Sequence, residues 1–217
     1  MATGSLAVAA ALGYPDGERA PATETLAAIA RITRRVEQPV TADFEHGYRL
    51  PAAELVKALT DAGAAGFNIE DADPATGLLV DPDAHAERLA AIRAACHEAN
   101  VDLVINARVD SFIAGEGSTT ARLADAIRRA RAYIEAGADC VYPFRTPDPE
   151  TAQAFIEQVD APVNLLCRPG GPGVHELAAL GAARISFGPG IFRLALAAAQ
   201  RAVAAIQAGS DPYAEAG

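Results

Sequence analysis

Lysine and cysteine are scarce in this sequence, and each scarcity disfavours a class of chemistry. The three cysteines (Cys96, Cys140 and Cys167) are odd in number and form no CxxC pair, which argues against a disulfide framework and a zinc site. The one lysine, Lys57, falls in the middle of a predicted helix. Because Schiff-base chemistry needs a desolvated lysine in a pocket, lysine-dependent aldolase and pyridoxal phosphate reactions are disfavoured. A reducing cytoplasm is the expected compartment.

Positive charge and long apolar runs are also lacking. The formal net charge is -10, so the chain has no basic footprint that would neutralise nucleic acid phosphates. No apolar run reaches the roughly 18 residues that a membrane span requires. The mildly apolar N-terminus lacks the basic region of a signal peptide. We therefore expect neither a nucleic acid partner nor a membrane.

Short apolar runs alternate with amphipathic segments along the 217 residues. Strands are predicted near residues 2–7, 39–43, 65–70, 102–108, 139–144, 162–167 and 183–187. Helices are predicted at residues 22–37, 51–62, 83–99, 119–136, 148–158, 173–180 and 189–207. Several strands follow an Ala-Gly-Ala or Leu-Gly-Ala signal, whose glycine is placed to end a helix in the left-handed conformation. This alternation predicts βαβ units and a parallel sheet.

The motifs and the number of units decide between two α/β architectures. A doubly wound sheet would carry a glycine-rich nucleotide turn after its first strand, and neither GxGxxG nor GxxxxGK[ST] is present. We therefore predict an α/β fold of the (β/α)8 TIM-barrel type, with residues 1–217 forming one domain. Seven strand–helix units are counted where the barrel needs eight, so the first unit is expected to be absent from this chain.

Polar side chains gather at the predicted strand ends on one parity, which would face a barrel interior. This set consists of Thr41, Asp43, Glu45, Asn68, Glu70, Asn106, Arg108, Asp110, Asn164, Arg168, Arg184 and Ser186. Because catalytic groups of such barrels lie at the C-terminal ends of strands, five strand ends are predicted to meet at one mouth. Each of Asp43, Glu45 and Glu70, considered alone, is explained about equally well as a site residue or as a capping or turn residue.

Two acidic strand ends beside an arginine predict a cation. Carboxylates from two strands would repel one another without one, and oxygen ligands without histidine or cysteine spacing suit Mg²⁺ or Mn²⁺. Arg108 then offers a fork for the acidic group of a substrate. His46 is a weaker candidate for an acid–base group, and His85, His97 and His175 are expected to face solvent from helices.

Seven segments together resemble the isocitrate lyase / phosphoenolpyruvate mutase superfamily. They are SLAVAAALGYPDGE, PVTADFEHGY, GAAGFNIED, INARVD, AYIEAGADCVY, PVNLL and LGAARISFGPG, and they extend over nearly the whole chain in the family's order. The resemblance implies a (β/α)8 barrel, usually a homotetramer in which neighbouring subunits exchange their last helices. It also implies Mg²⁺ and a small 2-oxo or 2-hydroxy di- or tricarboxylate substrate.

The resemblance further implies roles for individual residues. Asp43 would bind the metal directly, while Glu45 and Glu70 would hold the water molecules around it. Arg108 would bind the acidic group of the substrate. Backbone amides near Leu6 would bind the carboxylate of the substrate. Leu6 stands where relatives have Gly or Ala. The predicted substrate-binding residues are Ser5, Leu6, Arg108, Asn164 and Ser186.

The segment EDADPATGLLVDPDAH (residues 70–85) departs from the family pattern. It lacks the Lys-x-Cys-Gly-His motif of isocitrate and methylisocitrate lyases and the Lys and Asn of the mutase, so chemistry that needs those side chains is not supported. The sequence favours a Mg²⁺-dependent lyase or decarboxylase, such as an oxaloacetate decarboxylase, that cleaves a C–C bond through a metal-stabilised enolate. Two alternatives stay open: a P–C bond enzyme acting on a phosphonate such as phosphonopyruvate, and a catalytically inactive barrel that binds a carboxylate or serves as a subunit.

Overall fold

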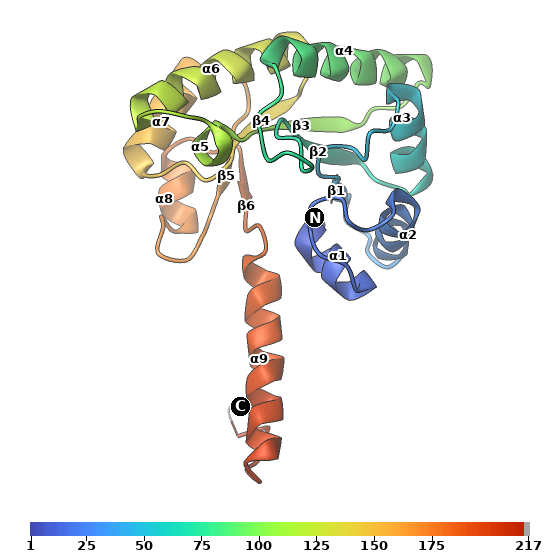
Figure 1. Cartoon of the computed structure of the whole chain (residues 1–217), viewed down its shortest axis with the longest axis vertical. Helices are drawn as coiled ribbons and strands as arrows, with labels where there is room; N and C mark the ends of the chain where they lie inside the picture. The colour runs from blue at the N-terminus through green and yellow to red at the C-terminus, as the bar shows by residue number, and fades with distance from the viewer. Residues whose placement is uncertain (215–217) are drawn as a thin grey trace.

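The computed structural model describes residues 1–214, in which parallel strands alternate with helices (Figure 1). The strands are β1 (Thr41–Asp43), β2 (Gly66–Glu70), β3 (Val104–Val109), β4 (Cys140–Pro143), β5 (Asn164–Leu166) and β6 (Arg184–Ser186). The helices are α1 (Ser5–Leu12), α2 (Ala22–Thr33), α3 (Ala52–Asp61), α4 (Pro82–Glu98), α5 (Ser111–Ala114), α6 (Thr119–Glu135), α7 (Pro149–Gln158), α8 (Val174–Ala179) and α9 (Gly190–Gln207). Every helix predicted from the sequence, and every strand predicted after residue 38, has an observed counterpart with shifted ends.

The strands form one parallel array in chain order. β1 to β4 make a four-stranded sheet, β5 pairs with β6, and a bridge between Val141 and Val163 joins the two groups. The first three residues run beside β1: the Thr41 amide donates to the Met1 carbonyl oxygen at 2.8 Å, and the Thr3 amide donates to the Thr41 carbonyl oxygen at 3.0 Å. The N-terminal segment therefore extends the array by one strand position.

The array curves back on itself, as a barrel requires. Arg184 on β6 donates from Nη2 to Thr41 Oγ1 on β1 at 2.7 Å. Within residues 1–214, no backbone ladder joins β6 to the N-terminal segment, so hydrogen bonds do not close the ring of strands. The arrangement is the predicted α/β fold of barrel type, with seven strand positions rather than eight.

The predicted strand near residues 2–7 is wrong beyond its first residue. Only Ala2 makes a bridge, to Thr41, and α1 begins at Ser5. The segment SLAVAAAL is rich in alanine, the residue with the highest helix propensity, and Gly13 ends it with a φ of 86°. The site residue Ser5 therefore lies at a helix N-terminus instead of a strand end.

The hydrophobic core lies between the outer face of the sheet and the helices that surround it. Phe67, Ile69 and Ile105 point outward from β2 and β3 and are fully buried with helix residues such as Leu59 and Leu89. Full burial of a side chain of this size stabilises the fold by roughly 1.5–3 kcal/mol. The intervening strand positions point the other way, into the barrel interior, where the candidate site lies.

Glycines end three helices as the sequence signals predict. Gly63, Gly137 and Gly181 follow α3, α6 and α8 with φ values of 75°, 102° and 98°. At Gly137 a side chain is excluded for a second reason, because a Cβ would lie 2.9 Å from Arg93 Cγ. These turns set the point at which β2, β4 and β6 enter the sheet.

The prediction that His85 faces solvent is wrong. Its exposed fraction is 2%, and its ring packs edge-on to Tyr133 with 4.8 Å between centroids. The reason is the helical repeat, since His85 precedes the buried Leu89 by four positions and shares its face of α4. His97 and His175 are exposed, as predicted.

Helix α9 stands away from the rest of the structure (Figure 1), and none of its residues is buried. Its exposed apolar side chains include Ile191, Leu194, Leu196, Val203 and Ile206. Among the described residues, no helix combines the length and apolar character needed to cross a membrane. The single-domain assignment of residues 1–217 stays a prediction, and residues 215–217 lie outside the described part of the chain.

Candidate active site

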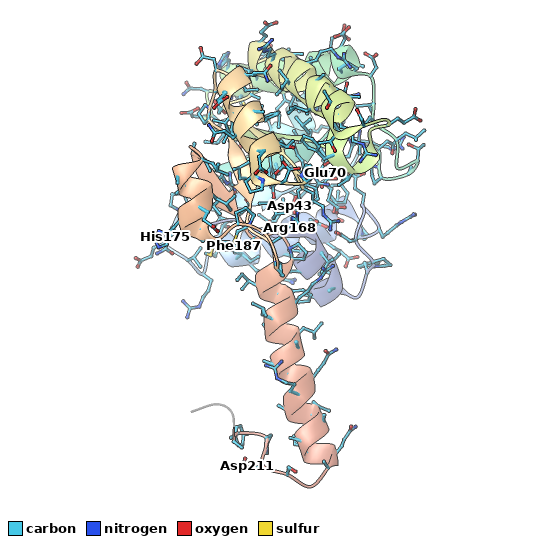
Figure 2. All side chains as sticks on the ribbon, turned by 90° about the vertical axis from the view of Figure 1, so that its left-hand side faces the viewer. Asp43, Glu70, Arg168, His175, Phe187 and Asp211 are labelled. Atoms are coloured by element: carbon cyan, nitrogen blue, oxygen red, sulfur yellow. The ribbon has the colours of Figure 1, made fainter. Side chains whose placement is uncertain are left out.

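The strand register brings predicted polar residues together inside the barrel. Asp43, Asn68 and Asn106 are successive partners across β1, β2 and β3, and Asn106 Nδ2 donates to Asn68 Oδ1 at 2.6 Å. Figure 2 shows Asp43 and Glu70 in the middle of the body, above the point from which α9 leaves. Arg168, of the same predicted set, lies after β5 and donates from Nη2 to the Pro147 carbonyl oxygen at 3.1 Å. The register of β1, β2 and β3 therefore brings Asp43, Asn68 and Asn106 together, as the parity argument predicts.

Arg108 is the centre of the next layer toward the strand C-termini. Its register partners are Glu70 on β2 and Tyr142 on β4. Nη1 donates to Glu70 Oε1, while Nε and Nη2 donate to the two carboxylate oxygens of Asp110 at 2.7 and 3.2 Å. The guanidinium carbon lies 3.8 Å from the centroid of the Phe144 ring, a cation–π distance. Arg108 is therefore held rigidly by two carboxylates and one aromatic face.

This cluster contains more carboxylates than cations. Burial raises the pKa of Glu70 well above its ordinary value; Arg108 opposes this shift, and Asp110 and Asp43 add to it. Burial also raises the pKa of Asp110, again against Arg108. Burial alone would lower the pKa of Arg108, but Glu70 and Asp110 raise it, so the guanidinium stays charged. One guanidinium contacts two carboxylates, Glu70 and Asp110, and the charge of Asp43 acts on it as well. A further cation would relieve this imbalance.

The two oxygens of Asp43 have different surroundings. Oδ2 accepts a hydrogen bond from the Ser5 amide at 3.0 Å, while Oδ1 is buried and has no hydrogen-bond partner in the described structure. The Asp43 amide donates to Thr3 Oγ1 at 2.9 Å. Leu6 follows in the first turn of α1, where amides have no acceptor within the helix. The structure thus brings Ser5 and Leu6 to the mouth beside Asp43.

Glu45 lies beyond the end of β1, so strand parity does not explain its position in the cluster. β1 ends at Asp43, and Glu45 is left-handed with a φ of 52°. Its Oε2 accepts from the Glu18 amide at 2.7 Å and its Oε1 from the Tyr48 hydroxyl at 2.8 Å. Burial raises the pKa of Glu45, these two hydrogen bonds oppose the shift, and Asp16 and Asp43 add to it. Asp16 is thus an acidic neighbour that the sequence analysis missed.

The loop that carries Glu45 has an unusual backbone. Tyr48 and Arg49 are left-handed as well, with φ values of 51° and 55°, and each such non-glycine residue costs of order 1–3 kcal/mol. Arg88 holds the loop by donating from Nη1 to the His46 carbonyl oxygen at 2.7 Å. The His46 ring is held too, with Nδ1 2.8 Å from the Glu70 carbonyl oxygen. Strain of this kind persists only where surrounding contacts impose it, which is common at functional sites.

These groups fit a divalent cation that is held largely through water. Asp43 Oδ1 is a buried oxygen in need of a partner, and the nearby donors are carboxylates. Within residues 1–214, no three His, Cys, Asp or Glu side chains are arranged to bind one ion directly, as a structural zinc site would require. Mg²⁺ usually keeps several waters and takes one or two carboxylates. Asp43 as direct ligand, with Glu45 and Glu70 in the water shell, stays a prediction.

Asn164 and Ser186 meet on β5 and β6 as neighbours. Asn164 Nδ2 and Oδ1 lie 3.0 and 3.1 Å from Ser186 Oγ, so each residue satisfies the other. Their predicted contact with substrate is not tested by this arrangement. The site also contains Tyr142 and Phe144, which the sequence analysis left out because the run DCVYPF was interpreted only as a buried strand.

A buried network behind the mouth fixes the ends of β2 and β3. Asp71, which is fully buried, accepts from the Asp110 amide at 2.8 Å, from the Tyr133 hydroxyl at 2.7 Å and from Arg129 Nη1 at 3.2 Å. Arg129 Nε donates to Asp125 Oδ2 at 2.8 Å. Burial raises the pKa of Asp71 to about 6. The network ties α6 to the strand ends that hold Glu70 and Arg108.

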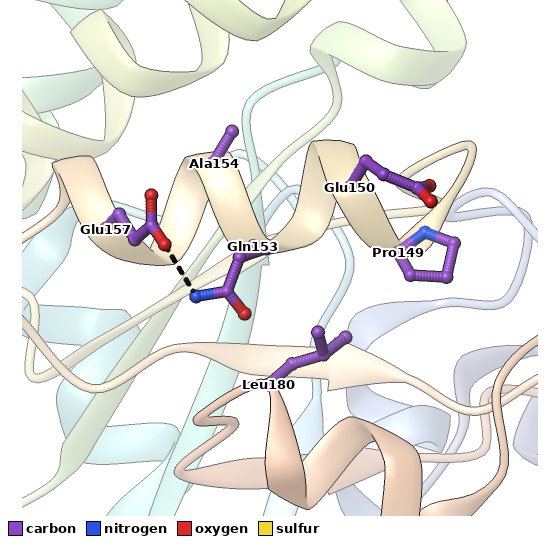
Figure 3. A pocket seen from close by; sticks show the side chains of 6 residues that line it. All are labelled: Pro149, Glu150, Gln153, Ala154, Glu157 and Leu180. Atoms are coloured by element: carbon purple, nitrogen blue, oxygen red, sulfur yellow. Dashed lines mark hydrogen bonds between the residues drawn. The ribbon is translucent and has the colours of Figure 1, made fainter.

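A groove on the outer surface is separate from this mouth. It has a volume of about 410 Å³ and is lined by residues of α7 together with Leu180 (Figure 3). Two of its side chains, Gln153 and Glu157, bond to each other at 2.8 Å. It shares no residue with the strand-end cluster, so we do not assign the chemistry to it.

The fold and mouth together define an enzyme of the barrel class that places carboxylates and an arginine at its strand ends. The family model for phosphoenolpyruvate phosphomutase matches residues 1–207. The chain belongs to this family and thus to the phosphoenolpyruvate mutase / isocitrate lyase superfamily, as the sequence motifs predict.

Curated relatives include enzymes of the same superfamily. The chain is 32% identical over 220 residues to an uncharacterized protein of Mycobacterium tuberculosis, covering 99% of this chain and 81% of that one. It is 34% identical to 2-methylisocitrate lyase of Escherichia coli (74% of this chain, 55% of that one) and 35% identical to oxaloacetate decarboxylase of Rhodopseudomonas palustris (79% and 58%). The chain spans little more than half of these two enzymes. The superfamily comprises carbon–carbon lyases, decarboxylases and mutases.

Solved structures share the architecture. A Burkholderia cenocepacia protein described as a candidate phosphonomutase superposes with a TM-score of 0.86 at 39% identity, over 93% of this chain and 83% of that one. A 2,3-dimethylmalate lyase superposes with a TM-score of 0.83 at 26% identity, over 98% and 74%. These matches confirm the barrel-type fold class.

Proposed function

We propose that this chain is a Mg²⁺-dependent lyase or decarboxylase that cleaves a C–C bond beside the carbonyl or hydroxyl of a small 2-oxo or 2-hydroxy di- or tricarboxylate. Oxaloacetate is the preferred candidate substrate. The observation that carries the proposal is the excess of carboxylates around Arg108, together with the unpartnered Oδ1 of Asp43. A divalent cation and an anionic substrate would satisfy both features. Mn²⁺ would serve in the same place.

The residues of the mouth have separate roles in this proposal. Asp43 would hold the cation, which polarises the substrate carbonyl when bound. Arg108 binds the distal acidic group, and Phe144 and Asp110 keep its guanidinium in one orientation. The first-turn amides of α1, including that of Leu6, receive the substrate carboxylate at the positive end of the helix. Asn164 and Ser186, on β5 and β6, would also contact the substrate.

The absence of the Lys-x-Cys-Gly-His motif from residues 70–85 is consistent with decarboxylation. Loss of CO2 from a 2-oxo dicarboxylate needs stabilisation of the enolate that remains, but no base that removes a proton from the substrate. The segment 70–85 offers no Lys-x-Cys-Gly-His motif, which this reaction does not require. Relatives that are oxaloacetate decarboxylases support the same choice.

P–C bond chemistry on a phosphonate such as phosphonopyruvate is the second candidate. It is favoured by one observation, the 39% identity to the candidate phosphonomutase structure. Arg108 would then bind a phosphonate instead of a carboxylate, which its planar fork also suits. The mouth alone does not separate the two substrates, and turnover must decide between them.

The exposed apolar face of helix α9 supports a homo-oligomer. We propose that this homo-oligomer is a tetramer. An amphipathic helix with no buried residue and exposed Ile191, Leu194 and Ile206 is stable in water only if another surface covers it. A second copy of the chain is the proposed cover. The three unpaired cysteines support a reducing, cytoplasmic location.

A substrate panel tests the proposed function. The purified chain is incubated with Mg²⁺ and oxaloacetate, 2-methylisocitrate, 2,3-dimethylmalate or phosphonopyruvate, and product is measured. We expect turnover of oxaloacetate that disappears with a chelator and returns with Mg²⁺. Turnover of phosphonopyruvate alone would select the second candidate. No turnover of any of the four would favour the inactive, carboxylate-binding barrel.

A further inference from the structure

Tyr142 is a buried tyrosine whose hydroxyl has no protein partner. The residue is 3% exposed, and its hydroxyl oxygen makes no hydrogen bond in the described structure. Three other tyrosines differ, because Tyr14 bonds to Glu24, Tyr48 to Glu45 and Tyr133 to Asp71. Buried hydroxyls almost always have a partner, so this exception calls for an explanation.

The hydroxyl lies inside the barrel at the level of the site. Tyr142 is the register partner of Arg108, and its strand neighbour Val141 points outward into the core. Arg108 and Asp43 are both close enough to affect its pKa. The Tyr142 ring packs against Phe144 with 5.4 Å between centroids and an interplanar angle of 83°. The ring is therefore fixed, and its hydroxyl faces the groups assigned to substrate and cation.

The Ser186 hydroxyl is a neighbour of Tyr142, but it does not satisfy the tyrosine hydroxyl. The Ser186 side chain lowers the pKa of Tyr142 as a hydrogen-bonding neighbour would, but its contact with the tyrosine oxygen does not have the geometry of a hydrogen bond. Its Oγ is already engaged with both side-chain polar atoms of Asn164. Burial raises the pKa of Tyr142, so the hydroxyl keeps its proton and remains a donor at physiological pH.

Two further polar atoms in the interior share this condition. Asp43 Oδ1 and Asn106 Oδ1 are buried without a partner, one layer below Tyr142. All three atoms belong to inward-facing positions on β1, β3 and β4. Two of these unpaired atoms are acceptors suited to a cation or water, and the Tyr142 hydroxyl is a donor suited to an anion.

We propose that Tyr142 is a further catalytic residue, whose hydroxyl donates a hydrogen bond to an oxygen of the bound 2-oxo acid anion. Arg108 neutralises the distal acidic group, and the Tyr142 hydroxyl stabilises negative charge on the reacting end, as an oxyanion donor does. No proton is transferred. The inference rests on the proposed function only in the class of ligand, a planar 2-oxo acid or its enolate.

The test replaces the hydroxyl alone and measures binding of oxalate, a planar dianion with adjacent oxygens like those of a 2-oxo acid. Oxalate affinity in the presence of Mg²⁺ is measured by calorimetry for the unmodified chain and for Tyr142→Phe. Because a hydrogen bond to a charged group is lost, we expect affinity to fall about 10-fold or more. The matched control is Tyr14→Phe, whose hydroxyl already bonds to Glu24 outside the mouth, and its affinity should stay within about twofold.

Two further readouts separate this role from a structural one. Removing an unpaired buried hydroxyl should leave the unfolding temperature unchanged or raised without ligand, whereas Tyr133→Phe should lower it. The chain has five tyrosines and no tryptophan, so oxalate should change the tyrosine absorption spectrum, and Tyr142→Phe should abolish that change. Unchanged oxalate affinity in Tyr142→Phe, or no oxalate binding by the unmodified chain, would overturn the inference. The substrate panel decides the proposed function separately.

Discussion

The Ser5 amide donates a hydrogen bond to Asp43 Oδ2 at 3.0 Å. This contact joins the N-terminus of α1 to the end of β1 and leaves Oδ1 of the same carboxylate unpartnered. One oxygen is thus positioned by the protein, while the other is free for a ligand. A carboxylate that is oriented in this way, among other buried acids, is well suited to bind a cation at the mouth of the barrel.

Arg108→Lys is expected to lower activity at least about 100-fold. A lysine retains the positive charge but loses the forked contact with Asp110 and the stacking on Phe144. The side-chain ammonium group is therefore no longer oriented toward the substrate. The measurement is kcat/KM for the best substrate of the panel. Arg131→Lys, which alters an exposed arginine on α6, is the matched control. Equal loss in both variants would contradict the role of Arg108.

Glu18→Ala is expected to weaken Mg²⁺ binding several-fold, although Glu18 is not proposed as a ligand. Its carboxylate accepts from the Tyr48 amide at 2.6 Å and so holds the strained loop that carries Glu45. Glu18→Gln retains an acceptor oxygen and should bind Mg²⁺ nearly as the unmodified chain does. Calorimetric titration with Mg²⁺ compares the three proteins. Identical affinities would show that the loop keeps its shape without Glu18.

The raised pKa of Asp71 leads us to expect that the free energy of unfolding depends on pH. Burial raises its pKa from 3.8 to about 6, so between these values the folded chain binds the proton more tightly than the unfolded chain. Its contribution to the free energy of unfolding therefore falls as pH rises through this window, by up to roughly 3 kcal/mol.

Asp71→Asn removes this titration. The free energy of unfolding of the unmodified chain minus that of the variant should decrease between pH 4 and pH 6.5, as measured by urea denaturation with a chelator present. Asp61→Asn, at an exposed position on α3, is the control and should show no such trend. A difference that stays constant with pH would mean that folding does not shift the pKa of Asp71.

Leu194→Glu tests the role of α9. Leu194 is 68% exposed, so a charge there should not disturb the barrel, but it would be buried if a second copy covers the helix. We expect light scattering to show a smaller assembly, with the circular dichroism spectrum of the barrel retained. Gln200→Glu adds the same charge at an exposed polar position of α9 and should disturb assembly less. A monomeric unmodified chain would contradict the proposed oligomer.

Periodicity and parity alone predict the central part of the site. Asp43, Glu70 and Arg108 each lie at the end of an apolar run on the inward parity, and the register of β2 and β3 pairs the last two directly. This works because strand parity is a property of the backbone that does not depend on distant contacts. The alternation of runs predicts the order of strands and helices for the same reason.

Features that depend on nonlocal contacts could not be predicted in this way. Glu45 is left-handed because contacts with Glu18 and Tyr48 impose that conformation, and these residues are distant or unremarkable in sequence. Asp71 and Arg129 pair across 58 positions. Tyr142 was hidden within an apolar run, and only the structure shows that its hydroxyl lacks a partner.

The measurement that tests the central claim most directly is the Mg²⁺ dependence of oxaloacetate loss in the unmodified chain and in Asp43→Asn. The variant keeps the shape of the side chain and its acceptor for the Ser5 amide but removes the charge that would hold the cation. We predict saturable dependence on Mg²⁺ for the unmodified chain and at least about a 100-fold lower rate for Asp43→Asn, with an unchanged unfolding temperature in chelator. Turnover that is independent of Mg²⁺, or equal in the two proteins, would contradict the account.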